Sequence, residues 1–160
     1  MSADETEVDP SRVVADADVL VADLLVGGVA REALDHVRRH SWVTLVASDE
    51  LLADARAVIA ALGDPALATD WYERIDSERI AVEQPPDDHP ALASAYRGNA
   101  PHLLTFDEQL TSTSANLSLQ SRMSVSIRTP DSFARLFDPE SLYESLHDDS
   151  YPGPDRDPRE

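Results

Sequence analysis

Apolar residues along the chain fall into short continuous runs separated by stretches with helical spacing. The runs are rich in residues that favour strands, and they lie at residues 12–15, 42–47, 79–82, 102–105 and 124–128. Strands that alternate with helices are typical of a parallel sheet with helices on both faces. The pattern therefore predicts an α/β fold: a three-layer α/β/α sandwich around a central, mainly parallel sheet.

Two of the intervening stretches show clear amphipathic helices, with apolar positions three and four residues apart. The first has an apolar face made of Ala30, Ala33, Leu34 and Val37. The second has an apolar face made of Leu51, Leu52, Ala55, Val58, Ile59 and Leu62. Ser48 is placed to cap this second helix, and Gly63 is placed to end it.

Prolines mark the starts of three further helices. Pro65, Pro90 and Pro130 each fit the first turn of a helix, and the helix that Pro130 opens is the last one expected. A weaker helix, rich in Ser and Thr, is predicted over residues 107–119. Residues 85–88 read as a loop because they combine two prolines with two aspartates.

The chain of 160 residues suits one domain, which we expect to span residues 12–146. Residues 1–11 are polar and acidic, and residues 147–160 contain three prolines and a glycine with little to bury. Both ends are therefore predicted to be disordered. No apolar run approaches the ~20 residues of a membrane span, and the acidic N-terminus has no secretory signal. We expect a cytoplasmic protein without a membrane contact.

The net charge of −18 narrows the conditions in which the protein works. The chain has 31 acidic residues against 13 basic ones, and every basic residue is an arginine. At ordinary salt such a chain repels nucleic acid and anionic membranes. At 1 M salt the screening length falls to about 3 Å and this repulsion is largely removed. The composition therefore indicates a halophilic, archaeon-like source with a salt-rich cytoplasm.

Missing residue types exclude several kinds of chemistry. The chain has no cysteine, which excludes disulfides, thiolate zinc sites and cysteine nucleophiles. It also has no lysine, so any mechanism that needs an ammonium group is excluded. The chemically active side chains that the chain has in excess are the carboxylates of its 31 acidic residues.

Acidic residues follow or adjoin several predicted strands. Asp16 and Asp18 follow the first strand, Asp107 comes two residues after Thr105 of the fourth, and Asp88 lies where a loop returns to the sheet. In a parallel sheet these positions share one edge, where ligands bind. Clustered carboxylates raise one another's pKa, and a divalent cation relieves this repulsion. Because Mg²⁺ and Mn²⁺ prefer oxygen ligands, we predict that Asp16, Asp88 and Asp107 bind one of these ions.

A fourth acid is expected from the helix that follows the second strand. Glu50 and Asp54 lie one turn apart there. With the apolar face centred on Ala55, Asp54 lies about 100° from the centre and Glu50 about 140°. Asp54 borders the buried face and is preferred, although Glu50 has the longer reach. Thr105 is expected either to orient Asp107 through its hydroxyl group or to be a strand-end threonine without a role.

Five short motifs occur in an order that resembles the PIN domain family of toxin-type and RNA-processing ribonucleases. The first is Asp16-Ala17-Asp18-Val19-Leu20 after a strand, close to Asp-x-Asn-Val-Leu. The second is the acidic helix start at residues 48–54, and the third is Asp88 before a helix of small residues. The fourth, at residues 100–107, resembles Ala-Asp-x-Leu-x-Thr-x-Asp, and the last is Thr129-Pro130-x-x-Phe133. Together they cover residues 12–137.

This resemblance implies Mg²⁺- or Mn²⁺-dependent hydrolysis of a phosphodiester in RNA, with Asp16, Asp54, Asp88 and Asp107 as catalytic metal ligands. It also implies an antitoxin-type protein partner and a homodimer. Two positions depart from the family pattern, because Asp18 replaces the usual Asn and Asp54 replaces the usual Glu. These departures leave an alternative open, a catalytically degraded PIN-like domain that acts as a binding or scaffold module.

The Asp16-Ala17-Asp18 sequence also resembles the first motif of haloacid-dehalogenase-type phosphatases, and Ser48 suits their second motif. That family normally needs a later lysine or arginine at the phosphate, and a cap or a longer chain. A response-regulator receiver likewise needs a lysine. Because the chain has no lysine, both alternatives are disfavoured.

Overall fold

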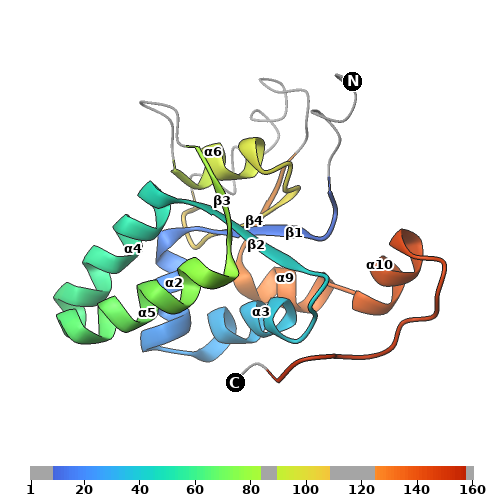
Figure 1. The fold of residues 1–160 in the computed structure, drawn as a ribbon, viewed down its shortest axis with the longest axis horizontal. Helices are drawn as coiled ribbons and strands as arrows, with labels where there is room; N and C mark the ends of the chain where they lie inside the picture. Colours follow the sequence, from blue (N-terminus) through green and yellow to red (C-terminus); the bar gives the residue numbers. More distant parts are fainter. Residues whose placement is uncertain (1–8, 84–89, 109–124, 158–160) are drawn as a thin grey trace.

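Five parallel strands form the centre of the molecule (Figure 1). The structure is a computed structural model that describes residues 9–83, 90–108 and 125–157. The strands are β1 (Arg12–Ala15), β2 (Thr44–Ser48), β3 (Ile80–Val82), β4 (His102–Leu104) and β5 (Ser126–Arg128). Their order across the sheet is β3-β2-β1-β4-β5, and every pair is parallel. The predicted α/β class with a parallel sheet is confirmed.

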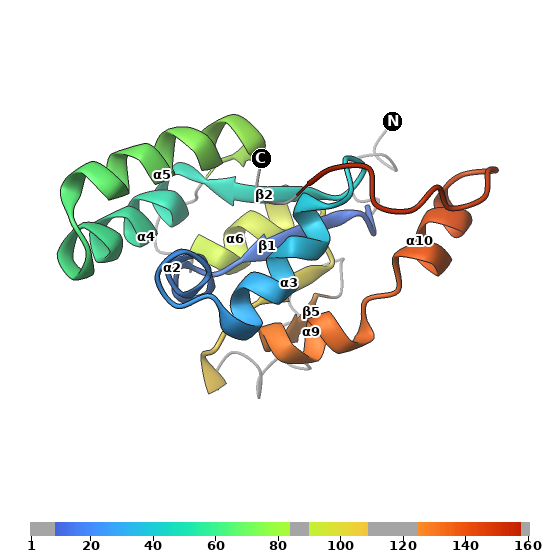
Figure 2. The same ribbon diagram turned by 90° about the horizontal axis from the view of Figure 1, so that it is seen from below.

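Helices cover both faces of this sheet. Those in the described residues are α2 (Ala17–Leu25), α3 (Gly28–Arg38), α4 (Asp49–Leu62), α5 (Pro65–Glu78), α6 (Pro90–Arg97), α9 (Pro130–Leu136) and α10 (Pro139–Leu146). Helix α6 lies on one side, and α2, α3 and α9 lie on the other (Figures 1 and 2). Helices α4 and α5 pack against each other beyond β2. The arrangement is consistent with the predicted three-layer sandwich.

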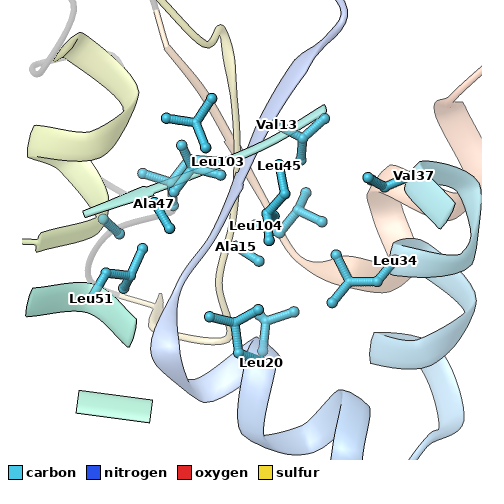
Figure 3. Packing of buried hydrophobic residues seen from close by; sticks show 14 of the residues in the cluster. Val13, Ala15, Leu20, Leu34, Val37, Leu45, Ala47, Leu51, Leu103 and Leu104 are labelled. Carbon is cyan, nitrogen blue, oxygen red and sulfur yellow. The ribbon is translucent and has the colours of Figure 1, made fainter. Parts of the chain in front are cut away.

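The core lies between the strands and the helices of both outer layers. Val13 and Val14 of the central strand β1 are fully buried, as expected for a strand covered on both faces. Leu34 and Val37 of α3 point toward the strands, where they meet side chains of β2 and β4 (Figure 3). The predicted apolar face of this helix is therefore the buried one.

The start of α4 forms as its sequence predicts. The Ser48 side chain accepts a hydrogen bond from the Leu51 amide at 3.1 Å, and Gly63 follows the last residue of the helix. The predicted apolar face is wider than the buried one, because Val58 and Leu62 are 42% and 70% exposed. Both lie in the second half of the helix, where Ile59 is the one buried residue.

Helix α6 sits unusually close to the sheet. A Cβ atom added at Gly98, just after the helix, would lie 2.4 Å from Cγ1 of Val46 in β2, which no packing tolerates. The Ser94 hydroxyl, fully buried in α6, accepts a hydrogen bond from the Ser48 amide at 3.0 Å. These two contacts fix α6 against the end of β2.

Two helices of the structure were not predicted. Helix α2 follows β1 directly, and its sequence ADVLVADLL is apolar on most sides, so no single apolar face shows in the pattern. Helix α10 follows the helix that was expected to be the last, and none of its residues is buried. With only eight residues, α10 is too short for its apolar positions to form a repeating pattern. The predicted loop at 85–88 and residues 109–119 of the predicted weak helix lie outside the described residues.

The segment after α10 differs from its expectation of disorder. It returns past the carboxyl end of α3 (Figure 1), where the Tyr151 hydroxyl lies 2.6 Å from Nε2 of His40. Asp155 accepts a hydrogen bond from the Ser41 amide at 2.8 Å, and Arg156 donates to the His40 carbonyl at 3.1 Å. Polar contacts with residues 39–41 hold this tail, and such contacts leave no apolar pattern in the sequence.

Within the described ranges, none of the helices combines the length and the apolar character that a membrane crossing requires.

Candidate functional site: the acidic edge of the sheet

The carboxyl ends of β1 and β4 lie side by side and bring the first acids together. The Asp16 amide donates to the Leu104 carbonyl at 2.8 Å, which continues the pairing of the two strands by one residue. Asp16 is also the N-cap of α2, and its Oδ1 accepts a hydrogen bond from the Ala17 amide at 2.8 Å. The start of a helix favours a carboxylate because unpaired amides and the helix dipole point toward it.

Thr105 connects the acids from beneath. Its side chain is fully buried, and its hydroxyl donates to Oδ2 of Asp16 at 2.9 Å, with Oδ2 of Asp18 at 3.4 Å. The hydroxyl has one proton, so the shorter contact with Asp16 takes most of it. The Thr105 oxygen also accepts from the Asp107 amide at 3.0 Å. Thr105 therefore orients the main chain of Asp107, as the sequence suggested, and holds Asp16 as well, which it did not.

Asp18 lies in the first turn of α2, beside Asp16, and its Oδ2 accepts a hydrogen bond from the Phe106 amide at 3.1 Å. Desolvation of its carboxylate, followed by the negative charge of Asp16, raises the pKa of Asp18 above its ordinary value. Hydrogen bonds from Phe106, Val19 and Thr105 act in the opposite direction but are outweighed. At neutral pH the pair therefore carries a repulsion that a bound cation would relieve.

The remaining predicted ligands are placed differently. Asp107 is exposed and follows the fourth strand at the same edge. Asp54 and Glu50 are both exposed on α4, so burial does not favour Asp54 as the helical-wheel argument expected. Asp88 lies outside the described residues.

The structure therefore brings the predicted ligand Asp16 and its neighbour Asp18 together on the Thr105 hydroxyl. Asp107 is linked to the same hydroxyl through its main-chain amide. In residues 9–83, 90–108 and 125–157, no three acidic or histidine side chains stand close enough to hold a metal ion together. We call Asp16, Asp18, Thr105 and Asp107 the acidic edge.

Sequence reasoning placed Asp18 beside Asp16 at this edge, but treated it as a departure from a family pattern and did not name it as a metal ligand. The structure makes it the closest acidic neighbour of Asp16 through their shared threonine. The available signal was the Asp-x-Asp spacing at a helix start, which places both carboxylates among free main-chain amides. The Phe106 amide, a main-chain donor, could not be found from residue types at all.

The chemistry of this pair fits a hydrated divalent cation. In the part of the chain that the structure describes, neither Asp16 nor Asp18 has an arginine partner, whereas Asp23 pairs with Arg38 and Asp49 pairs with Arg79. Mg²⁺ commonly binds through one or two carboxylates while it keeps several waters. Two neighbouring carboxylates without a cation are therefore a suitable donor set.

No curated protein and no solved structure matches the chain. One family model matches it over residues 7–159, a span that includes both the acidic edge and the tail up to Asp157. Because this match covers nearly all of the 160 residues, the chain belongs to DUF7384, a family of unknown function.

Proposed function

We propose that the chain is a PIN-like phosphodiester hydrolase that cleaves RNA with Mg²⁺ or Mn²⁺ at the acidic edge. The observation that carries this proposal is the convergence of Asp16 and Asp18 on Thr105 at the carboxyl end of a central parallel strand. The sheet order, with β1 at the centre and both acids directly after it, is the context that the motif resemblance requires.

The chain's own residues have separate roles in this proposal. Asp16 and Asp18 hold the hydrated cation, and Asp107 approaches from the next strand. Asp88 and Asp54 are the further ligands that the resemblance implies. Thr105 keeps the Asp16 carboxylate in place, and the start of α2 fixes its direction. The cation, when bound, polarises the phosphate and lowers the pKa of a water molecule.

The net charge of −18 sets the conditions for this activity. An RNA backbone approaches so acidic a protein only when salt screens the repulsion. We therefore place the protein in a salt-rich cytoplasm and expect cleavage in multimolar KCl. An antitoxin-type partner that covers the acidic edge, and a homodimer, are the assemblies that belong to this proposal.

RNA cleavage by purified variants tests the proposal. Wild type, Asp16→Asn and Asp107→Asn are compared in multimolar KCl with Mn²⁺, Mg²⁺ or EDTA. We expect metal-dependent cleavage that falls at least about 100-fold in both variants, the scale of a catalytic group's contribution. Asp70→Asn is the matched control, because Asp70 is an exposed acid on α5, away from the acidic edge. Equal cleavage by all four proteins would contradict the proposal.

A second function, a PIN-like binding or scaffold module without catalysis, is favoured by one specific observation. Among the described residues no third carboxylate joins Asp16 and Asp18, and the helix acid Asp54 is exposed on α4. Calorimetric titration with Mn²⁺ separates the two functions. A folded wild type that neither binds Mn²⁺ nor cleaves RNA supports the module, whereas Mn²⁺ binding that Asp16→Asn abolishes supports the hydrolase.

A further inference from the structure

A groove lies away from the acidic edge, between helices α2 and α3 on one side and α5 on the other. It consists of two adjoining cavities that share Arg38, Arg74, Ile75 and Glu78. The larger cavity has a volume of about 290 Å³, which is close to the lower limit of ordinary small-ligand sites, about 300 Å³. We call it the arginine groove. The tail closes one end of it, because Arg156 and Asp157 line the smaller cavity.

Arginines outnumber acidic residues in the lining of the arginine groove, whereas acidic residues are in excess in the chain as a whole. Four arginines line the two cavities, namely Arg31, Arg38, Arg74 and Arg156, against three acids, Asp23, Glu78 and Asp157. Arg38 pairs with Asp23 and Asp35, and Arg74 forms an exposed pair with Glu78 at 3.6 Å. The whole chain has 13 basic residues against 31 acidic ones. An anion therefore meets less repulsion here than over most of the molecule.

Two of these guanidinium groups are held by carbonyl oxygens, which leave their positive charge in place. Arg31 donates to the Asp23 and Leu24 carbonyls at 2.9–3.2 Å, and Arg156 donates to the His40 carbonyl at 3.1 Å. Such bonds orient a guanidinium without neutralising it. Planar guanidinium groups bind phosphate oxygens in pairs of hydrogen bonds, so the groove suits a phosphate group.

The groove also has an apolar floor. Leu34, Val43, Leu45 and Ile75 line the smaller cavity, and Trp71 lines the larger one. Trp71 is buried, with 9% of its surface exposed. A flat ring that lies on this floor would bury apolar surface next to the arginines, which inorganic phosphate alone cannot do.

Asp23 adds a third feature, a buried acceptor. Its Oδ2 pairs with Arg38, whereas its Oδ1 is buried and has no hydrogen-bond partner among residues 9–83, 90–108 and 125–157. Buried polar atoms normally have partners. A hydroxyl group brought to this oxygen by a ligand would supply the missing donor.

We propose that the arginine groove binds a nucleoside monophosphate, with the base on the apolar floor, a ribose hydroxyl near Asp23 and the phosphate on the arginines of α5 and the tail. This ligand class combines a flat ring, hydroxyl donors and a phosphate within one small molecule. The proposal does not depend on RNA cleavage at the acidic edge, because it concerns other residues.

Calorimetric titration of the full chain with adenosine 5′-monophosphate tests this proposal, in KCl at which circular dichroism shows a folded protein. We expect saturable binding at one site with a Kd below about 1 mM. Adenosine and inorganic phosphate, titrated separately, are each expected to bind at least 10-fold more weakly. Inorganic phosphate that binds as tightly as the nucleotide would overturn the assignment of a nucleoside.

Single substitutions locate the site. Arg74→Gln and Arg156→Gln are each expected to raise the Kd for adenosine 5′-monophosphate 5- to 10-fold. Arg135→Gln removes an exposed arginine of α9 that does not line the groove, and its Kd is expected to stay within twofold of wild type. Equal weakening by all three variants, or no binding by wild type at 10 mM nucleotide, would overturn the proposal.

A further variant separates phosphate binding by Arg156 from the part that this residue plays in holding the tail. Asp155→Asn removes the charge that binds Ser41 but leaves every arginine of the groove in place. We expect this variant to keep at least half of the wild-type affinity. A loss as large as that of Arg156→Gln would show that the tail position matters and not the guanidinium, and would overturn the assignment of Arg156.

Discussion

The carboxylates at the two ends of helix α2 have different partners. At its start, Asp16 and Asp18 are bound by a hydroxyl and by main-chain amides, with no arginine partner among the described residues. Near its end, Asp23 is 5% exposed and pairs with Arg38, which also pairs with Asp35. Among the described residues, arginine thus neutralises buried acids such as Asp23, whereas no arginine pairs with Asp16 or Asp18. This difference is the reason why we propose that the acidic edge binds a cation from solution.

Removing Arg38, the partner of Asp23 near the end of α2, should cause the largest loss of stability of the protein. Arg38→Gln leaves Asp23 and Asp35 buried without their cation. Loss of one partner from a buried ion pair typically destabilises by about 3–5 kcal/mol, and we expect about 3 kcal/mol in a denaturant titration. Arg135→Gln, on the surface of α9, serves as the control. A loss below about 1 kcal/mol would mean that the pair does not carry the stability that its burial indicates.

Removing the Thr105 hydroxyl, which binds Asp16 in the acidic edge, should lower the stability by a smaller amount. Thr105→Val leaves Oδ2 of Asp16 and the Asp107 amide without a fully buried partner. Loss of such hydrogen bonds costs about 1–3 kcal/mol, and Mn²⁺ affinity should fall with it. Thr105→Ser keeps the hydroxyl and should restore the Mn²⁺ affinity, measured by calorimetry. A valine variant with unchanged affinity would show that Thr105 does not position the metal-binding acids.

Neutralising one acid of the pair should stabilise the protein slightly. The pKa of Asp18 is raised in the folded state, so ionisation of this group opposes folding above that pKa. The penalty is present at pH 7 and disappears as the pH falls below the ordinary value of 3.8. Asp18→Asn should therefore raise the free energy of unfolding at pH 7 by less than about 1 kcal/mol, because the side chain is solvent-screened.

Denaturant titrations of wild type and Asp18→Asn at several pH values check this sign. The difference between the two proteins should shrink toward zero as the pH approaches 3.8. A difference that grows on acidification would contradict it. Asp70→Asn, at an exposed site on α5, should show no such trend.

Adding a divalent cation should sharpen the contrast between the two ends of α2 further. Mn²⁺ at ten times its Kd stabilises a protein that binds it in the folded state by about 1.4 kcal/mol. We expect this gain in wild type and its loss in Asp16→Asn, measured as a shift in Tm. Asp49→Asn, which alters an acid already paired with Arg79, should keep the full gain.

The parts of the fold that the sequence predicted are those with a strong local signal. The apolar run of β1 and the Ser48 cap of α4 both depend on neighbouring residues, and both were predicted at the right place. Helix α2 was missed because apolar residues surround it, and α10 because its eight residues are too few for a periodic pattern. Periodicity identifies a helix only when one side is apolar and the other polar.

The candidate site shows the same division. Asp16 and Asp107 could be predicted because the topology of a parallel sheet brings strand ends to one edge. The hydrogen bonds from the Phe106 amide and the Thr105 hydroxyl could not be predicted, because they depend on the exact positions of atoms in the folded chain. The sequence therefore places Asp16, Asp18 and Asp107 at one edge, and the side-chain geometry shows that Asp18 shares Thr105 with Asp16.

The two tryptophans give the molecule a built-in optical readout. Trp42 packs edge-on against Tyr143 and lies 5.5 Å from the ring of His40, to which the tail is bound, whereas Trp71 lines the arginine groove. Their surroundings would change in different events, release of the tail for Trp42 and the proposed binding of a nucleotide in the groove for Trp71. Single-tryptophan variants, Trp42→Phe and Trp71→Phe, would thus let fluorescence follow each event by itself without an attached dye.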